Sequence, residues 1–375
     1  MHYIIYILVL LLAASCSKKK ESTETAEEVL EIIHRVNQQY QSTHKAQVRS
    51  FWDDAVYHTG NMEVYALTGN KNYMQYSIDW AEYNQWKGAT GNNKTEWRST
   101  YGETPEYVLF GDWQICFQTY ADLYKLDPDT MKIARAREVM EYQMSTLKLD
   151  YWHWVDALYM VMPVMVKMYD ITQNPLYLKK LYQYLATTDS IMYDTESGLY
   201  YRDAKYLYPS HQTINGKKDF WARGNGWAFA ALAKVLKQLP TNDKYRPEYI
   251  TRYQAMAKAV ATCQQPEGYW TRSLIDPDQA PGAETSGTAL FTYSYLWGIN
   301  NGLLDANTYL PIVEKSWKYL KTVALQADGK IGYIQPIGEK AIPGQIVDAN
   351  SYYNFGVGVF LLAACERVHF LEKNN

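Results

Sequence analysis

The stretch Tyr169-Asp-Ile-Thr-Gln-Asn-Pro-Leu-Tyr177 decides the fold, because it ends one helix-like segment and starts another within nine residues. Its Asn and Asp residues suit the end of a helix and the cap of the next one. Turns of the same kind lie at residues 65–73, 124–131, 236–245 and 297–305, at intervals of 45 to 67 residues. This recurrence predicts a chain of consecutive helix pairs.

The segments between the turns are of two kinds. Asp129–Leu147, Leu176–Ala186 and Tyr309–Val323 alternate apolar and charged faces, which is typical of outer helices. Trp154–Val166 and Trp227–Leu236 are apolar nearly all round, which is typical of helices packed on both sides. Such repeats cannot bury their apolar faces alone, so a set that closes on itself makes a barrel of inner and outer helices.

Both ends of the chain extend this pattern. A first helix near Ala26–Tyr40 and a last apolar run at Phe355–Glu366 bring the total to about six helix pairs. No linker divides the chain, so we expect one all-α catalytic domain over residues 26–372. We also expect loops on one rim, where a site would lie, from segments that put a glycine turn before a short extended aromatic piece. These segments are residues 194–202, 265–272 and 326–333.

Composition restricts the class of function. The 375 residues are 47% hydrophobic, which provides a sizeable core and excludes general disorder. The net charge is −3 and the 37 basic residues form no long stripe, so nucleic acid is not an expected partner. Aromatic residues make up 15%, with 35 Tyr and 12 Trp against 9 Phe, which suits a cleft that stacks on a polar ligand.

The N-terminus predicts export. The apolar run Tyr3–Ala14 is too short to span a bilayer, and small residues precede Cys16, as in a bacterial lipoprotein signal. We therefore expect a signal peptide over residues 1–16, lipid on Cys16, and a flexible tether over residues 17–25. The protein would then be tethered in the cell envelope, facing the periplasm or the cell surface. An ordinary cleaved signal and a membrane-anchored start remain alternatives, since the n-region has no Lys or Arg.

The other cysteines are Cys116, Cys263 and Cys365, an odd number that cannot all pair with one another. Each lies in an apolar, helix-like context with no second metal-ligating residue at short spacing. We expect buried free thiols and no structural metal.

The segment Trp152-His-Trp-Val-Asp156-Ala-Leu-Tyr-Met160 is the most informative for chemistry. Asp156 is the only charged residue between Trp154 and Val166. Burying a carboxylate costs several kcal/mol unless it is bonded or protonated, so such a residue needs a reason to be there. A nearby helix N-terminus would favour the anion and aromatic surroundings would favour the acid, a balance that suits proton exchange. A structural Asp that caps or links helices is the alternative.

A second group of residues is Phe220-Trp-Ala-Arg-Gly-Asn-Gly-Trp227 at the start of a strongly helical run. Its glycines allow a tight turn with exposed backbone N–H groups, and Arg223 could grip a carboxylate bidentately while a ring stacks on a sugar. The alternative is a glycine-rich helix start with Arg223 in a structural ion pair.

Several further candidates stand alone in the sequence. They are Asp112, Tyr57 with His58, His153, His211, and the run Glu284-Thr-Ser-Gly287. No Ser-His-Asp elbow, phosphate loop, dinucleotide fingerprint or His-rich metal spacing is present, so no cofactor is implied.

Four segments in this order resemble the unsaturated rhamnogalacturonyl hydrolases of glycoside hydrolase family 105, which are related to the unsaturated glucuronyl hydrolases of family 88. They are residues 152–160, Phe220–Trp227, Glu284-Thr-Ser-Gly-Thr-Ala-Leu290 and Phe355-Gly-Val-Gly-Val-Phe-Leu-Leu-Ala363. The resemblance implies an (α/α)6 barrel without a metal. It also implies an oligosaccharide substrate, left by pectin-degrading or similar lyases, with a 4,5-unsaturated uronic acid at its non-reducing end.

The resemblance also implies a mechanism and roles for residues. The Asp matching Asp156 protonates C4 of the vinyl ether and then assists water addition at C5, so one carboxyl group serves as acid and base. Asp112 matches a second aspartate of the family's site, and Trp221 and Arg223 match substrate-contacting positions. His211 matches a binding histidine. Other substrate-binding candidates are His153 and Tyr57.

Two other functions remain compatible with the sequence. An (α/α)6 hydrolase or lyase acting on intact saturated chains would need a second carboxylate facing Asp156, which Asp112 could supply. A glycan-binding lipoprotein without catalysis would not need a desolvated acid.

Overall fold

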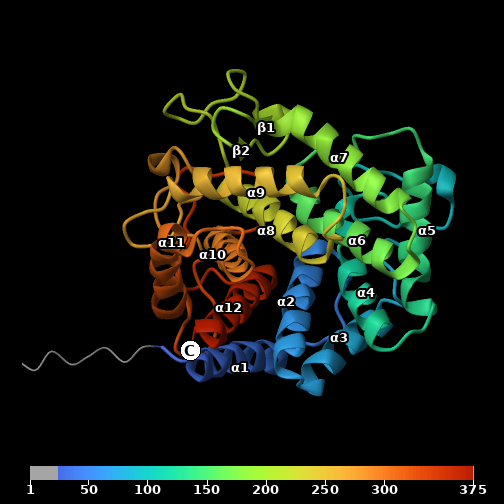
Figure 1. Cartoon of the computed structure of the whole chain (residues 1–375), viewed down its shortest axis with the longest axis horizontal. Coiled ribbons are helices and arrows are strands. Elements are labelled where there is room, and N and C mark those ends of the chain that lie inside the picture. Colours follow the sequence, from blue (N-terminus) through green and yellow to red (C-terminus); the bar gives the residue numbers. More distant parts are fainter. Residues whose placement is uncertain (1–23, 375) are drawn as a thin grey trace, which may run out of the picture.

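The computed structural model describes residues 24–374, which form a helical barrel (Figure 1). Its α-helices are α1 (Ala26–Thr43), α2 (Trp52–Thr68), α3 (Lys71–Tyr83), α4 (Cys116–Leu126), α5 (Met131–Ser145), α6 (Asp156–Thr172), α7 (Leu176–Met192), α8 (Ala222–Gln238), α9 (Arg246–Ala261), α10 (Thr285–Asn300), α11 (Ala306–Tyr319) and α12 (Asn354–Asn374). A two-stranded antiparallel hairpin joins β1 (Tyr193–Asp194) to β2 (Leu199–Tyr200). Short helical turns lie at Lys94–Glu96, Gly111–Trp113, Ala204–Tyr206, Pro277–Gln279 and Leu320–Ala324.

The even-numbered helices form an inner ring. Each of α2, α4, α6, α8, α10 and α12 packs on the next, and α12 returns to α2 and closes the ring. The odd-numbered helices lie outside this ring, as Figure 1 shows. The predicted (α/α)6 barrel is therefore confirmed.

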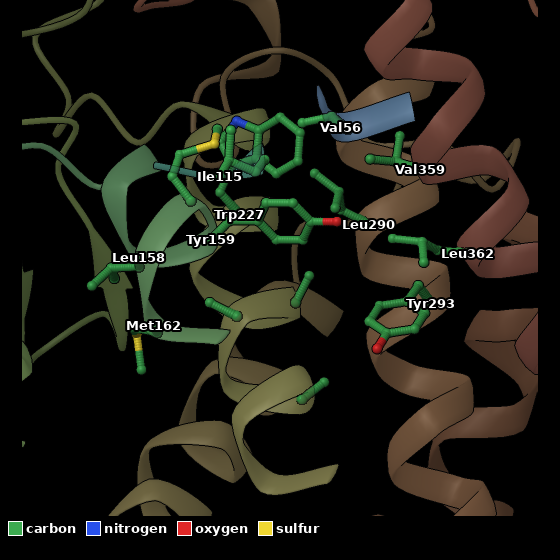
Figure 2. Close-up of a cluster of buried hydrophobic side chains, with 14 of the residues drawn as sticks. Val56, Ile115, Leu158, Tyr159, Met162, Trp227, Leu290, Tyr293, Val359 and Leu362 are labelled. Carbon is green, nitrogen blue, oxygen red and sulfur yellow. The ribbon is translucent and has the colours of Figure 1, made fainter. Parts of the chain in front are cut away.

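Side chains from all around the inner ring meet in the core (Figure 2). Val56, Tyr159, Trp227, Leu290 and Leu362 come from five different inner helices, and each is at most 1% exposed. The inner helices read as apolar nearly all round because they bury both faces, one against the ring and one against an outer helix.

The turn that decided the fold behaves as its residues require. Gln173 adopts a left-handed conformation with φ 56° and ends α6. The side chain of Asn174 then accepts a hydrogen bond from the backbone N–H of Leu176 at 3.0 Å, at the start of α7. A polar pair thus reverses the chain between an inner and an outer helix.

The last inner helix, α12, is long and apolar enough to cross a membrane by length and composition. Its most apolar window is 78% buried inside the barrel, which is what a core helix requires. Its composition therefore reflects packing between α2 and α10.

The start of the described chain is fixed to the barrel. The carboxylate of Glu24 accepts hydrogen bonds from Trp317 and Arg367, and Thr25 forms a capping box with Glu28 at the start of α1. These two residues do not belong to a flexible tether, so the part of the predicted tether 17–25 that the structure describes is ordered. The predicted signal peptide and Cys16 lie outside the described residues. Cys116, Cys263 and Cys365 are buried and unpaired, as predicted.

The rim of the barrel is built by repetition. Before α6, Trp154 pairs with Asp203 in an isolated antiparallel β-bridge. Before α8, Trp221 pairs with Ser273 in the same way. The backbone N–H of Val155 donates to the carbonyl of Arg202 at 2.8 Å, just as that of Ala222 donates to Arg272 at 2.9 Å. Each predicted glycine-turn segment thus continues into an extended piece that lies against the start of an inner helix.

Candidate active site

A cavity of about 670 Å³ opens at this rim, beside the starts of α2 and α6 and the turn that precedes α4. It is lined by aromatic, acidic and basic side chains from several loops: Trp52, Tyr101, Phe110, Asp112, Asp150, His153, Trp154, Asp156, Met160, Ile191, Arg202, Asp203, Ala204, Lys205, Ile337, Gly338 and Glu339. Aromatic side chains together with charged ones suit a polar sugar that must be stacked and oriented.

Asp156 is the first residue of α6, and its side chain is 15% exposed. Its Oδ2 is buried without a hydrogen-bond partner in the described chain, and Arg202 Nε lies 3.9 Å away. Burial raises the pKa of Asp156, while the charges of Arg202 and Arg223 oppose that rise. The cavity lining therefore contains a carboxyl group whose pKa burial raises and whose Oδ2 forms no hydrogen bond within the described chain.

Asp112 is brought to the same cavity by the short helical turn Gly111–Trp113. A Cβ on Gly111 would lie 3.0 Å from Val161 and 3.4 Å from Trp154, so glycine allows the turn to approach α6 closely. Burial and the charge of Asp156 raise the pKa of Asp112 well above its usual range. The two predicted aspartates thus share one site and influence each other electrostatically.

His153 also lines the cavity, and burial together with the charge of Lys148 lowers its pKa. The neighbouring Trp154 ring stacks on Phe110 with centroids 4.5 Å apart. These rings form one wall beside Asp156. A neutral imidazole here can donate or accept a hydrogen bond to a sugar hydroxyl.

Trp221 and Arg223 do not line the cavity but hold one of its loops. Trp221 Nε1 donates to Gln335 Oε1 at 2.8 Å. Arg223 donates to the carbonyls of Gln335 at 2.7 Å and Pro336 at 2.8 Å, and its side chain is buried. This differs from the expected grip on a substrate carboxylate, because both terminal nitrogens already bind backbone carbonyls.

The run beginning at Glu284 supports the same loop. Glu284 is fully buried and caps α10 by accepting from the N–H groups of Ser286 and Gly287. It also accepts from the N–H of Gln335 at 3.1 Å. The two helix starts at α8 and α10 therefore fix the segment that leads to Ile337 and Glu339 in the cavity wall.

His211 and Tyr57 lie away from the cavity lining. His211 Nε2 lies 2.8 Å from Asp219 Oδ2, and its ring packs edge-on against Tyr206 in a neighbouring rim loop. Tyr57 is fully buried in α2 and donates to Asn37 Oδ1 at 2.5 Å. The structure thus gives Tyr57 a place in the packing of α1 on α2.

Arg202, Lys205 and Glu339 line the cavity, although no sequence pattern singled them out. Arg202 ends one of the glycine-turn segments, so the repetition of these segments indicated its neighbourhood but not its role. Glu339 lies in an irregular loop without periodicity, and the anchoring described above helps to hold this loop at the site. No group of three or more His, Cys, Asp or Glu side chains placed to hold a metal occurs within residues 24–374.

A closed ring of six helix pairs, with a desolvated acid at an inner-helix start and aromatic walls around it, defines a carbohydrate-processing enzyme of the (α/α)6 class. The sequence matches glycosyl hydrolase family 88 over residues 25–371, and the chain belongs to that family. It is a glycoside hydrolase.

A similar protein and a similar solved structure support the same assignment. The chain is 30% identical over 326 residues to an unsaturated 3S-rhamnoglycuronyl hydrolase of Formosa agariphila, covering 84% of this chain and 83% of the relative. A solved structure of a family 88 glycosyl hydrolase from Bacteroides vulgatus is 84% identical, has a TM-score of 0.92, and is matched over 93% of this chain and 100% of that chain.

Two further structures share the fold. One is named a polysaccharide lyase, is 68% identical, has a TM-score of 0.90, and is matched over 92% of this chain and 98% of that chain. The other is a possible member of family 105 from Salmonella enterica, 19% identical with a TM-score of 0.74, matched over 96% of this chain and 99% of that chain. The second likeness concerns the fold alone.

Proposed function

We propose that this hydrolase removes a 4,5-unsaturated uronic acid from the non-reducing end of lyase-generated oligosaccharides, with Asp156 as its acid and base. The observation that carries the proposal is Asp156, which lines the cavity and whose buried Oδ2 has no hydrogen-bond partner among the described residues. The Formosa agariphila relative, named an unsaturated 3S-rhamnoglycuronyl hydrolase, supports this substrate class.

The reaction begins with the neutral form of Asp156. Its proton passes to C4 of the vinyl ether, and the positive charge that develops is shared by C5 and the ring oxygen. Water adds to C5 and gives its proton to the Asp156 carboxylate, which restores the acid. The C5 hemiketal then opens to a ketone, C1 becomes a hemiacetal, and the hemiacetal releases the aglycone as an alcohol.

The electrostatics of the site suit this cycle. Burial favours the protonated form of Asp156 that is needed first, and raises its pKa. The helix start of α6 and the charge of Arg202 favour the carboxylate that is needed second. A group balanced between the two forms can exchange a proton in both directions.

The saccharide attached to the uronate belongs to this proposal as well. We propose a rhamnose-containing saccharide, because the Formosa agariphila relative is named an unsaturated 3S-rhamnoglycuronyl hydrolase. A screen of lyase-generated oligosaccharides from pectin, glycosaminoglycans and algal polysaccharides would identify the preferred source by loss of the ultraviolet absorbance of the unsaturated sugar.

Action on intact saturated chains is the competing function. Asp112 shares the cavity with Asp156, and the structure that is 68% identical is named a polysaccharide lyase. Offering saturated and unsaturated disaccharides side by side separates the two. Conversion of the unsaturated sugar alone supports the proposal, and conversion of the saturated sugar overturns it.

Anchoring to the cell envelope through lipid on Cys16 is a separate proposal. Its support is the apolar run before Cys16 and the start of the family match at residue 25. Metabolic labelling with a palmitate analogue, compared between the native chain and Cys16→Ala, tests it. Label on the native chain alone supports lipidation, and equal labelling of both overturns it.

A further inference from the structure

Three arginines stand close to the rim of the barrel, and their guanidinium groups differ in what they bind. Arg223 donates to the carbonyls of Gln335 and Pro336. Arg272 donates to the carbonyls of Gln345 and Pro281, both at 2.7 Å. Both side chains therefore fix loops and have their terminal nitrogens occupied by backbone.

Arg202 is different because its guanidinium faces carboxylates and the cavity. Its Nη1 binds Asp203 and lies 3.4 Å from Glu339 Oε2, while its Nε lies 3.9 Å from Asp156 Oδ2. Its side chain is 21% exposed and lines the cavity, whereas Arg223 and Arg272 do not line it. All three arginines have a buried Nε without a hydrogen-bond partner in the described chain, but only that of Arg202 lies beside the proposed acid within the cavity lining.

The substrate chemistry favours a cation at this place. The carboxyl group of a 4,5-unsaturated uronate is attached to C5, next to the carbon that receives the proton. A group that holds this carboxylate must therefore stand close to Asp156. The cavity lining contains the acids Asp112, Asp150, Asp156, Asp203 and Glu339, which would repel an anion unless a cation compensates locally.

Arg202 and Lys205 are the lining cations among the described residues. Lys205 is 70% exposed, so water screens its charge, whereas the more buried Arg202 offers a planar, bidentate fork. Glu339 already puts a carboxylate oxygen 3.4 Å from Arg202 Nη1, which shows that a carboxylate fits beside this fork.

We infer that Arg202, and not Arg223, binds the carboxylate of the unsaturated uronate, and that Glu339 competes with the substrate for it. This inference rests on the proposed function and assigns the group that makes the site specific for uronates. Arg202 determines specificity directly, whereas Arg223 acts through the loop that carries Glu339.

The test compares an unsaturated uronyl disaccharide with its methyl ester, in the native enzyme and in Arg202→Lys and Arg202→Ala. Rates are taken on the low-pH plateau, where Asp156 is protonated in every variant. Because a charge-assisted hydrogen bond to a carboxylate is lost, we expect Arg202→Ala to raise KM for the acid about 10- to 100-fold. The methyl ester should change only a few-fold. The KM of Arg202→Lys for the acid should lie between those of the native enzyme and Arg202→Ala.

Two variants serve as controls. Arg272→Lys disturbs an arginine in the equivalent rim segment, so it should affect the acid and the ester equally. Glu339→Gln removes the competing charge and should lower KM for the acid by about two- to fivefold. An equal loss on acid and ester in Arg202→Ala, or a higher KM for the acid in Glu339→Gln, overturns the inference.

Failure of the proposed function gives a different result. In that case the native enzyme consumes neither the unsaturated acid nor its ester. Calorimetric binding of both compounds then still decides the role of Arg202. Weaker binding of the acid alone in Arg202→Ala supports the inference, and equal binding to native and variant proteins contradicts it.

Discussion

Trp221 Nε1 donates to Gln335 Oε1 at 2.8 Å and so joins the start of α8 to a loop more than a hundred residues further along the chain. Together with Arg223, this bond holds the backbone that continues to Ile337, Gly338 and Glu339 in the cavity wall. The glycine-rich start of α8 therefore positions a loop of the cavity wall without lining the cavity itself.

Substitutions that remove these hydrogen bonds should weaken substrate binding, and more strongly as more bonds are lost. Trp221→Phe removes one hydrogen bond and should cost about 1 kcal/mol of stability, whereas Arg223→Met leaves two carbonyls unsatisfied and should cost about 2–4 kcal/mol. KM should rise in the same order, since the loop forms part of the wall. Urea denaturation and steady-state kinetics measure both effects. Unchanged KM in a folded Arg223→Met protein would contradict the anchoring role.

Replacing Asp156 by Asn should abolish turnover while preserving the fold. The amide cannot supply or retake the proton, so we expect kcat to fall by about 10³-fold or more. Loss of ultraviolet absorbance of the unsaturated sugar measures turnover, and circular dichroism and calorimetry check folding and ligand binding.

The matched control is Asp150→Asn, because Asp150 lines the same cavity but its side chain is 60% exposed beside Lys148. It should retain most of the activity. Near-normal turnover by Asp156→Asn, or an equally severe loss in Asp150→Asn, would remove Asp156 from its proposed role.

Activity should depend on pH in a defined direction. In the proposed mechanism the acid form of Asp156 reacts first. The value of kcat/KM should then be level at low pH and fall as pH rises through the pKa of Asp156, which burial raises above the usual range for Asp. Arg202→Ala removes a charge that lowers this pKa, so the descending limb should move to higher pH. A limb that stays in place, or moves to lower pH, would be evidence against this coupling.

The other end of the barrel offers a test of stability. At the end of α8, Lys237 Nζ lies 2.9 Å from Glu63 Oε2, and the neighbouring lysines help to lower the pKa of Glu63 to about 2. Because this pair is partly exposed, Lys237→Met should cost about 1 kcal/mol. The loss should be present at pH 7 and disappear as pH falls through the folded pKa of Glu63.

Lys234 lies one turn earlier in α8, and its replacement should have the opposite effect on stability at pH 7. It is 7% exposed, and burial lowers its pKa from 10.5 to about 8. The folded state therefore loses this proton before the unfolded state does, so native stability gains from Lys234 as pH rises from 8 to 10.5. Lys234→Met should be at least as stable as the native protein at pH 7, with the difference shrinking at higher pH. Urea denaturation of both proteins at pH 7 and at a pH between 8 and 10.5 measures this difference in stability. A difference that grows with pH would contradict the lowered pKa of Lys234.

The fold could be predicted because its determinants are local. Turns such as Tyr169–Tyr177 carry their own stop and cap signals, and helices such as α8 are apolar nearly all round because they are enclosed. Asp156 could be chosen for a similar reason, since a lone acid in an apolar helix stands out in the sequence.

The rest of the site depends on contacts between distant segments. Arg202 reaches Asp156 only because the extended piece before it lies against the start of α6. Glu339 reaches the site because hydrogen bonds with Trp221, Arg223 and Glu284 hold its loop, and no local sequence pattern indicates these bonds. Tyr57 has the residue type of a ligand contact, but a hydrogen bond to Asn37 places it in the packing of α1 on α2.

The central claim is that the enzyme hydrates C4=C5 and leaves the C1–oxygen bond untouched in the rate-determining step. Secondary deuterium isotope effects on initial rates, with substrate labelled separately at C4 and at C1, test it most directly. Protonation changes C4 from trigonal to tetrahedral, so deuterium at C4 should give an inverse effect and deuterium at C1 should give none. A normal effect at C1 with none at C4 would show direct displacement of the aglycone and would contradict the account.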